Sequence, residues 1–180
     1  MTEHTYKQFN VELEEIRSGV LQMGGLVESQ VRNALEGLRT GDLTLLDQVI
    51  DEDQRVNLMQ KELDDECNHI IAKRQPAAVD LRLVMTVIKS VGDLERIGDE
   101  AKKIAKAARR LHQADVKFMP RVGLSQETDT AIEMLRSALD AFARVNADTI
   151  EDMRGKDAEV DSGFKAVMRQ LITYMMEDPR

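Results

Sequence analysis

The sequence is short of aromatic residues, of cysteine and of uninterrupted apolar segments. Its 180 residues include no Trp and a single cysteine, Cys67, which excludes an internal disulfide and is typical of a reducing compartment. No apolar run approaches the roughly 18 residues of a membrane helix, and Met1 to His4 carry neither the basic nor the apolar region of a signal peptide. We therefore expect a cytoplasmic protein.

Positive charge is also scarce. The chain has 25 Lys and Arg against 33 Asp and Glu, which gives a formal net charge of −8. Nucleic-acid binding needs a surplus of Lys and Arg on the contact surface, so DNA and RNA are not expected partners. Aromatic residues make up 3% of the chain and hydrophobic residues 42%, with 10 Met, so the core must be aliphatic and rich in methionine. An all-helical bundle fits this composition best.

Apolar residues recur at three- and four-residue spacing along five segments, and no segment alternates as a strand does. Thr40-Gly41-Asp42 and Gln75-Pro76 separate the first three segments. The sequence therefore predicts an all-α protein. Five helices are expected, at about 5–38, 43–74, 77–113, 126–145 and 147–177, the second of them capped by Asp42. The segment 114–125 is expected to be a linker.

The linker separates two copies of one unit. The segment 53–57 (Asp-Gln-Arg-Val-Asn) matches the segment 157–161 (Asp-Ala-Glu-Val-Asp), 104 residues later. The ends of the two copies agree within one residue, at Gln75-Pro76 and Asp178-Pro179. An internal duplication is therefore expected, with the first domain at 1–113 and the second at 126–180. The second copy stops where its third helix should begin.

Two carboxylates, Glu95 and Asp99, lie about one helical turn apart on one face of the third helix. Like charges at this spacing destabilise an exposed helix by roughly 0.2–0.5 kcal/mol unless a cation compensates them. Arg82, Arg96 or a divalent ion could do so. Because the pair points away from the apolar stripe and shares its face with Lys102, a solvated or salt-bridged surface is the alternative to a metal site.

Two further pairs of polar residues lie beside apolar stripes. Asp53 and Asn57 lie at the edge of the stripe of the second helix, and Asp157 and Asp161 lie similarly on the fifth. Oxygen ligands suit hard ions such as Mg²⁺, Mn²⁺ or iron, whereas structural zinc prefers Cys and His. Placement beside a seam between helices suits a metal ligand.

Three segments together resemble the PhoU family of bacterial phosphate-signalling regulators. They are 74–82 (RQPAAVDLR), 93–99 (DLERIGD) and 174–178 (YMMED), and the resemblance spans essentially the whole chain. It implies a pair of three-helix bundles in tandem, of which the second lacks its third helix in this chain. Either the sequence is a fragment, or another chain completes the second bundle.

The same resemblance implies a non-enzymatic role. PhoU-like proteins repress the phosphate-starvation response by bridging the phosphate-specific ABC transporter, through its ATPase subunit, to the PhoR sensor kinase. Such a chain controls phosphate uptake and homeostasis and meets the membrane only through its partners. Asp80, Arg82 and Arg96 are the residues we expect at partner contacts, although Asp80 also suits the positive end of the helix dipole.

Some PhoU-like proteins also bind metal clusters through acidic motifs on two helices. The resemblance then implies that Glu95 and Asp99 face Asp53 and Asn57 around an ion such as iron, manganese, magnesium or zinc. The second copy offers a similar pair without a partner helix. The implied metal ligands are Asp53, Asn57, Glu95, Asp99, Asp157 and Asp161. A carboxylate-bridged metal-binding bundle is therefore the alternative function.

The missing helix leaves apolar side chains of the second copy incompletely covered. Exposed apolar patches of this size usually mark interfaces, so we expect a homodimer. The residues concerned are Leu135, Leu139, Phe142, Val160, Phe164, Val167 and Leu171.

Overall fold

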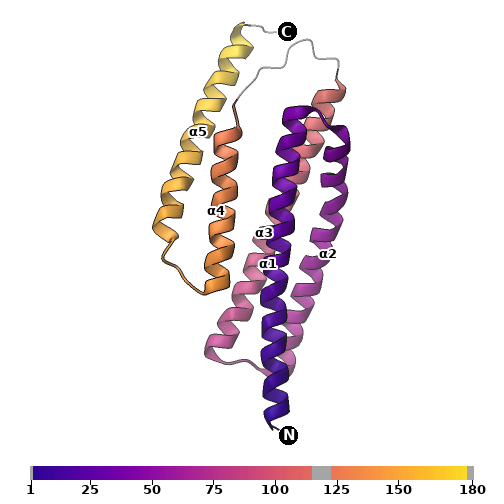
Figure 1. Cartoon of the computed structure of the whole chain (residues 1–180), viewed down its shortest axis with the longest axis vertical. Coiled ribbons are helices and arrows are strands. Elements are labelled where there is room, and N and C mark those ends of the chain that lie inside the picture. Colours follow the sequence, from indigo (N-terminus) through magenta and orange to yellow (C-terminus); the bar gives the residue numbers. More distant parts are fainter. Residues whose placement is uncertain (1, 115–122, 178–180) are drawn as a thin grey trace. The chain divides into compact units, whose positions relative to one another are not determined.

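The computed structural model describes residues 2–114 and 123–177. Within these ranges the chain forms five helices and no strand, which confirms the predicted all-α class (Figure 1). None of these helices is long and apolar enough to cross a membrane. The helices are α1 (Thr2–Thr40), α2 (Leu43–Arg74), α3 (Ala78–Gln113), α4 (Ser125–Arg144) and α5 (Ile150–Glu177). Their ends lie within about three residues of the predicted ones, and most of the predicted linker lies outside the described residues.

Local chemistry explains where the first two helices end. Gly41 has a φ of 76°, in the left-handed region that favours glycine, and Asp42 then caps α2 by accepting a hydrogen bond from the Leu45 N–H at 3.1 Å. At the other end of α2, Gln75 is left-handed with φ 49° and donates its N–H to the Ile71 carbonyl. The residue that follows is a proline, which cannot continue the helix.

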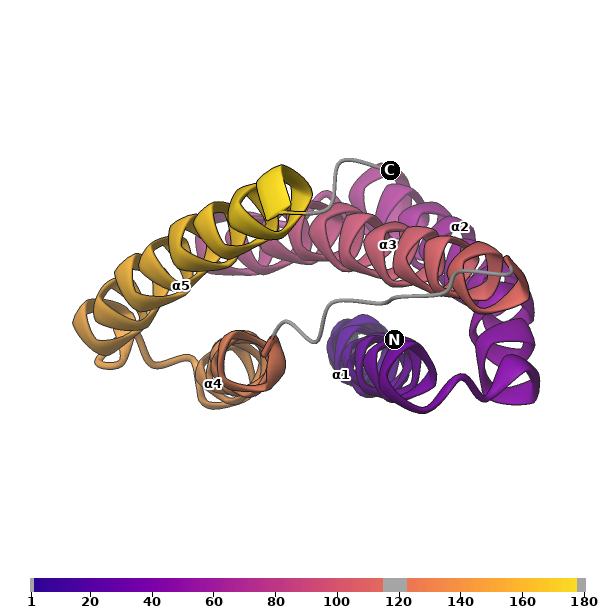
Figure 2. The ribbon, with the colours of Figure 1, turned by 90° about the horizontal axis from the view of Figure 1, so that it is seen from above.

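The chain divides into two compact units, of which the first is Met1–Arg110. Its helices α1, α2 and α3 run alongside one another and share one core (Figure 2). The core is made of small and branched aliphatic side chains, as expected from the scarcity of aromatic residues. One buried cluster that joins the three helices consists of Ala34, Leu46, Val49, Ala101, Ala105 and Ala108.

The lone cysteine belongs to this core. Cys67 is fully buried on α2, and burial raises the pKa of its thiol to about 11. A thiol with this pKa is protonated at neutral pH and is a poor nucleophile. Cys67 therefore packs as a small hydrophobic residue.

The second unit, Leu111–Arg180, contains the pair α4 and α5, which pack on each other. Ile132 and Val167 are buried in the seam, at 3% and 9% exposed. Phe164 is 61% exposed and Ile172 52%. The apolar face of this pair is therefore only partly covered, and Phe164 is the most exposed of the residues predicted there.

The core of the first unit yields a test of how tightly its helices pack. A β-carbon added at Gly37 would lie 2.5 Å from Leu46 Cδ2 and 2.7 Å from its Cγ, and Leu46 is fully buried, so neighbouring core side chains would have to shift with it. We expect Gly37→Ala to lower the free energy of unfolding by about 1–3 kcal/mol, the usual cost of overpacking. Urea denaturation followed by circular dichroism measures this change.

The matched control is Gly92→Ala. A β-carbon at Gly92 meets nothing within 4 Å, so this variant should gain up to about 1 kcal/mol from the higher helix propensity of alanine. Equal stabilisation by both substitutions would show that a β-carbon fits at Gly37 in the α1–α2 contact and would contradict the expected overpacking.

Candidate functional site

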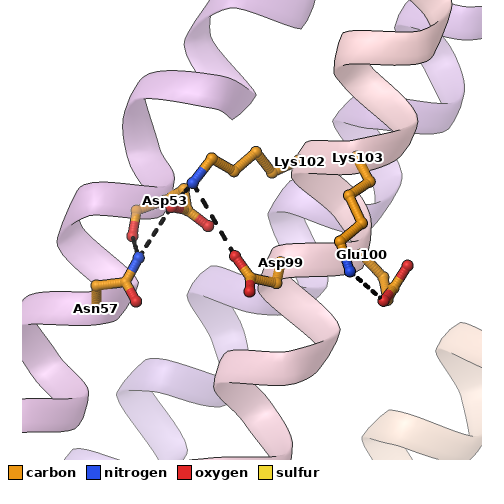
Figure 3. Close-up of polar contacts among 6 residues, drawn as sticks. All are labelled: Asp53, Asn57, Asp99, Glu100, Lys102 and Lys103. Atoms are coloured by element: carbon orange, nitrogen blue, oxygen red, sulfur yellow. Dashed lines mark hydrogen bonds and ion pairs between the residues drawn. The ribbon is translucent and has the colours of Figure 1, made fainter.

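Three of the predicted site residues, Asp53, Asn57 and Asp99, lie together between α2 and α3 beside a lysine, Lys102. Asp53 and Asn57 project from α2, and Asp99 projects from α3 toward them (Figure 3). Lys102, one turn beyond Asp99, reaches back across the seam to Asp53. Glu95, on the same face of α3, adds its charge to the field at Lys102. An ammonium group therefore lies between Asp53 on α2 and Asp99 on α3.

The contacts of this cluster are short and involve a buried carboxylate. Asp53 is 2% exposed. Lys102 Nζ donates to Asp53 Oδ2 at 2.5 Å and lies 4.0 Å from Asp99 Oδ1. Asn57 Nδ2 donates to Asp53 Oδ2 and to the Asp53 carbonyl, both at 2.9 Å. The carboxylate of Asp53 is thus held by a cation and an amide, which a buried charge requires.

The charges around Lys102 stabilise its protonated form. The hydrogen bond to Asp53 raises the pKa of Lys102, burial opposes the rise, and the charges of Asp53, Asp99 and Glu95 add to it. Because this pKa is raised on folding, the stabilisation is present at every pH below the ordinary lysine pKa and is lost only when the pH rises through the folded value. Lys102 is therefore a fixed positive charge at neutral pH.

Whether the cluster fits a metal ion depends on Lys102. Its ammonium lies between the carboxylates of Asp53 and Asp99, and Asn57 turns its amide nitrogen to Asp53, so a divalent ion between the two carboxylates would have to displace the ammonium. In the part of the chain that the structure describes, no three or more His, Cys, Asp or Glu side chains are grouped so that they could hold an ion. The arrangement is an ion-pair network, which is the alternative that the sequence left open for this face.

The corresponding residues of the second unit do not form such a cluster. Asp157 and Asp161 lie on α5 with exposed side chains, and within the described residues no third acidic, His or Cys side chain joins them as a metal group. The acidic side chains of this unit that make inter-helix contacts lie elsewhere, as in the pair of Lys156 with Glu133 at 2.8 Å.

The three residues predicted at partner contacts all lie on α3. Asp80 is half-buried in the first turn, where a negative charge suits the helix dipole. Arg82 and Arg96 are exposed, and Arg96 makes only a loose pair with Asp93 at 3.7 Å. Both guanidinium groups are thus available at the surface of the helix.

Two features of the first unit were not predicted. Gln30 is fully buried on α1, and neither polar atom of its side chain has a hydrogen-bond partner within the described residues. Its position within the apolar stripe of α1 was a usable signal. The second feature is a groove of about 700 Å³ between α1 and α2, with Glu14, Glu15, Glu62 and Glu66 among its lining residues. Burial and the charges of Glu15 and Glu62 raise the pKa of Glu66.

The inter-helix ion pair can be tested by removing its cation. We expect Lys102→Met to lower the free energy of unfolding by about 3 kcal/mol, because the buried carboxylate of Asp53 then lacks a counter-charge. The double variant Asp53→Leu/Lys102→Met should recover most of this loss, since neither charge remains. Urea denaturation of the unmodified chain, the single variants Lys102→Met and Asp53→Leu, and the double variant gives the coupling free energy.

The control for this cycle is Lys103→Met. Lys103 pairs with Glu100 at 2.7 Å, but both side chains are about two-thirds exposed, and exposed pairs contribute at most about 1 kcal/mol. Equal losses from Lys102→Met and Lys103→Met would mean that the Asp53 pair contributes no more than a surface contact.

Comparison with known proteins identifies the family. The sequence model described as PhoU domain matches residues 20–108 and 124–180. The phosphate-specific transport system accessory protein PhoU homolog of Pseudomonas putida is 48% identical over 180 residues, which cover 100% of this chain and 70% of the relative. The phosphate-specific transport system accessory protein PhoU of Escherichia coli is 44% identical over 181 residues, which cover 100% of this chain and 74% of the relative.

Solved structures agree with the sequence comparison. The crystal structure of PhoU from Pseudomonas aeruginosa superposes with a TM-score of 0.89 at 46% identity, over 96% of this chain and 82% of that one. The phosphate transport system regulatory protein PhoU from Streptococcus pneumoniae gives a TM-score of 0.85 at 29% identity, over 94% of this chain and 80% of that one. These matches confirm the resemblance found in the sequence, and the chain belongs to the PhoU family.

Proposed function

We propose that the chain is a non-enzymatic accessory protein of a phosphate-specific transport system and a negative regulator of the phosphate-starvation response. It acts in the cytoplasm as an adaptor that links the ATPase subunit of the phosphate ABC transporter to the PhoR sensor kinase. The observation that carries this proposal is the similarity along the entire chain to proteins named as accessory proteins of that system, at 44–48% identity.

The chemistry of the first unit supports a role in recognition. Its most buried charged side chain, Asp53, accepts hydrogen bonds from Lys102 and Asn57 within the fold. The exposed charges lie along the outer faces of long helices, where partner proteins can reach them, and Asp80, Arg82 and Arg96 are the contact residues we propose. The helices that present them belong to the first of two compact helical units, and the second unit contains α4 and α5.

The second candidate function is metal binding by the cluster at Lys102. It is favoured by the approach of the Asp53 and Asp99 carboxylates to one cation, with Asn57 bonded to Asp53 and the charge of Glu95 acting on the same site. A hard divalent ion or iron would take Asp53 and Asp99 as carboxylate ligands and Asn57 as a neutral oxygen ligand. Such an ion would supply structural cross-linking of α2 to α3, or redox chemistry if it is iron.

One experiment on the full chain separates the two functions. Protein purified without chelator is analysed for bound metals and then used to capture the ATPase subunit and the kinase, alongside the variant Glu95→Ala. For an adaptor, we expect at most substoichiometric metal, and capture of both partners by both proteins. The physical reason is that Lys102 already pairs with Asp53, the buried carboxylate of the cluster, so the fold that presents the partner contacts has no need of an ion.

The opposite outcomes are equally definite. Stoichiometric iron with an absorbance that bleaches on reduction would favour the metalloprotein. Failure of the unmodified chain to capture either the ATPase subunit or the kinase would contradict the adaptor function. Capture that requires both Glu95 and a bound ion would join the two functions in one mechanism.

We also propose that the chain is a homodimer, with the partly covered face of α4 and α5 against the same face of a second copy. The contact residues are exposed apolar side chains of α5, among them Phe164, Met168 and Ile172, which recur every four residues along one face. An isologous pairing of two such faces would bury them in a four-helix arrangement.

Light scattering at micromolar concentration measures this association. We expect a dimer for the unmodified chain and a monomer for Phe164→Glu/Ile172→Glu, because two carboxylates on each copy would enter the apolar contact. The control is Lys165→Glu/Arg169→Glu, which changes exposed positions beside the apolar face. A monodisperse monomer for the unmodified chain would contradict the proposal.

A further inference from the structure

The outer surface of α3 carries basic residues at a regular spacing. A Lys or Arg stands at every seventh position over most of the helix, and all five side chains are exposed. We call this set the basic stripe. Its members are Arg82, Lys89, Arg96, Lys103 and Arg110.

Seven residues are close to two helical turns, so the basic stripe stays on one side of the helix. Each step of seven shifts the position by only about 20° around the axis. From the first member to the last the stripe extends about 42 Å at 1.5 Å per residue. Its five members therefore follow one slowly winding line along nearly the whole of α3.

The positive charge of the stripe is mostly uncompensated. Arg96 and Lys103 make only exposed contacts within one turn, with Asp93 at 3.7 Å and with Glu100 at 2.7 Å. No other member forms an ion pair with any residue that the structure describes. Figure 3 shows Lys103 and Glu100 on the side of α3 turned away from the Asp53 cluster.

The stripe stands out against the rest of the first unit. Helix α3 contains eight Lys and Arg against five Asp and Glu, whereas α2 contains four against eight, and the whole chain has a net charge of −8. The apolar face of α3 is occupied by the core, which includes Val84, Val91, Leu94 and Ala101. A basic face on an acidic protein therefore lies opposite the packed face of the same helix.

We propose that the basic stripe is a docking surface for an acidic α-helix of a partner protein, with Asp or Glu at seven-residue spacing. Charges repeated every seven residues meet matching charges on a second helix when the two cross at about 20°, as e and g positions do in coiled coils. The proposal rests on the proposed function only for the partner's identity, the transporter ATPase or the kinase, and it specifies which surface of the chain docks.

The pattern of the stripe favours a protein over a membrane or a nucleic acid. Asp93 and Glu100 alternate with Arg96 and Lys103 along the central part of the stripe. These acids would be repelled by anionic lipid headgroups and by phosphates, but they can pair with Lys or Arg on a helix of mixed charge. Between Lys89 and Lys103 the line carries no exposed large apolar residue to insert into a bilayer.

Charge reversal on the full chain tests the proposal. The stripe variant is Lys89→Glu/Arg96→Glu/Lys103→Glu. The control variant, Arg55→Glu/Lys61→Glu/Lys73→Glu, makes the same change in net charge at exposed positions of α2. Circular dichroism establishes that both variants keep their helices. The probes are a synthetic helical peptide with Glu at every seventh position, a peptide of the same composition in scrambled order, and the purified transporter ATPase subunit.

We expect the stripe variant to bind the ordered peptide and the ATPase subunit at least about tenfold more weakly than the unmodified chain does, because each reversal sets like charges opposite one another. The control variant should bind both within about twofold, since its changes lie outside the contact. Binding by the unmodified chain should weaken as salt is added.

Several outcomes would overturn the inference. They are equal losses in the two variants, equal affinity for the ordered and scrambled peptides, no binding of the ordered peptide, or binding of phosphatidylglycerol vesicles in place of the peptide. Binding of the peptide without binding of the ATPase subunit or the kinase counts against the proposed function and leaves the docking surface standing. Binding of the ATPase subunit that survives charge reversal of the stripe would contradict the docking surface and leave the proposed function standing.

Discussion

The inter-helix pair of Lys102 and Asp53 is the interaction that sets how α3 presents its faces. Asp53 is the one buried charged residue in the described part of the chain, and a buried carboxylate without a partner costs several kcal/mol. The rotation of α3 that buries Val84, Val91 and Leu94 also brings the Lys102 ammonium to it. With Lys102 held at the seam, Lys103 and Arg96 lie roughly 100° and 120° around the helix from it. The same contact that satisfies a buried charge therefore turns the basic stripe outward.

Close packing adds a second constraint on the same unit. A chain with 3% aromatic residues fills its core with small side chains, and Ala101, Ala105 and Ala108 allow α3 to lie close to its neighbours. Such a core tolerates little change in volume, as the fit of Leu46 against Gly37 illustrates. The helices can then approach closely enough for Lys102 to span from α3 to α2. Packing and the ion pair thus support each other, since each fixes the distance that the other needs.

The helices could be predicted from the sequence, whereas the role of Lys102 could not. Helix periodicity is a local property, and the ends of α2 follow from Asp42 and Gln75, whose chemistry is visible in the sequence. The meeting of Asp53 with Asp99 came from family resemblance. Spacing within one helix shows which residues share a face, so Lys102 was placed with Glu95 and Asp99. It does not show which residue of α2 lies opposite, because that depends on the register between helices that are far apart in the chain.

The ion pair also links the two candidate functions physically. A divalent ion at the cluster would gain the carboxylates of Asp53 and Asp99 but would first have to expel the Lys102 ammonium, so its apparent affinity is reduced by the free energy of the existing pair. Lys102 is 27% exposed at its side chain, so it can swing toward solvent without crossing the core. A displaced Lys102 would add its positive charge to the exposed surface of α3, the helix that carries the basic stripe. An ion bound at the cluster would therefore also change the charge that α3 presents at its surface, through the release of this one side chain.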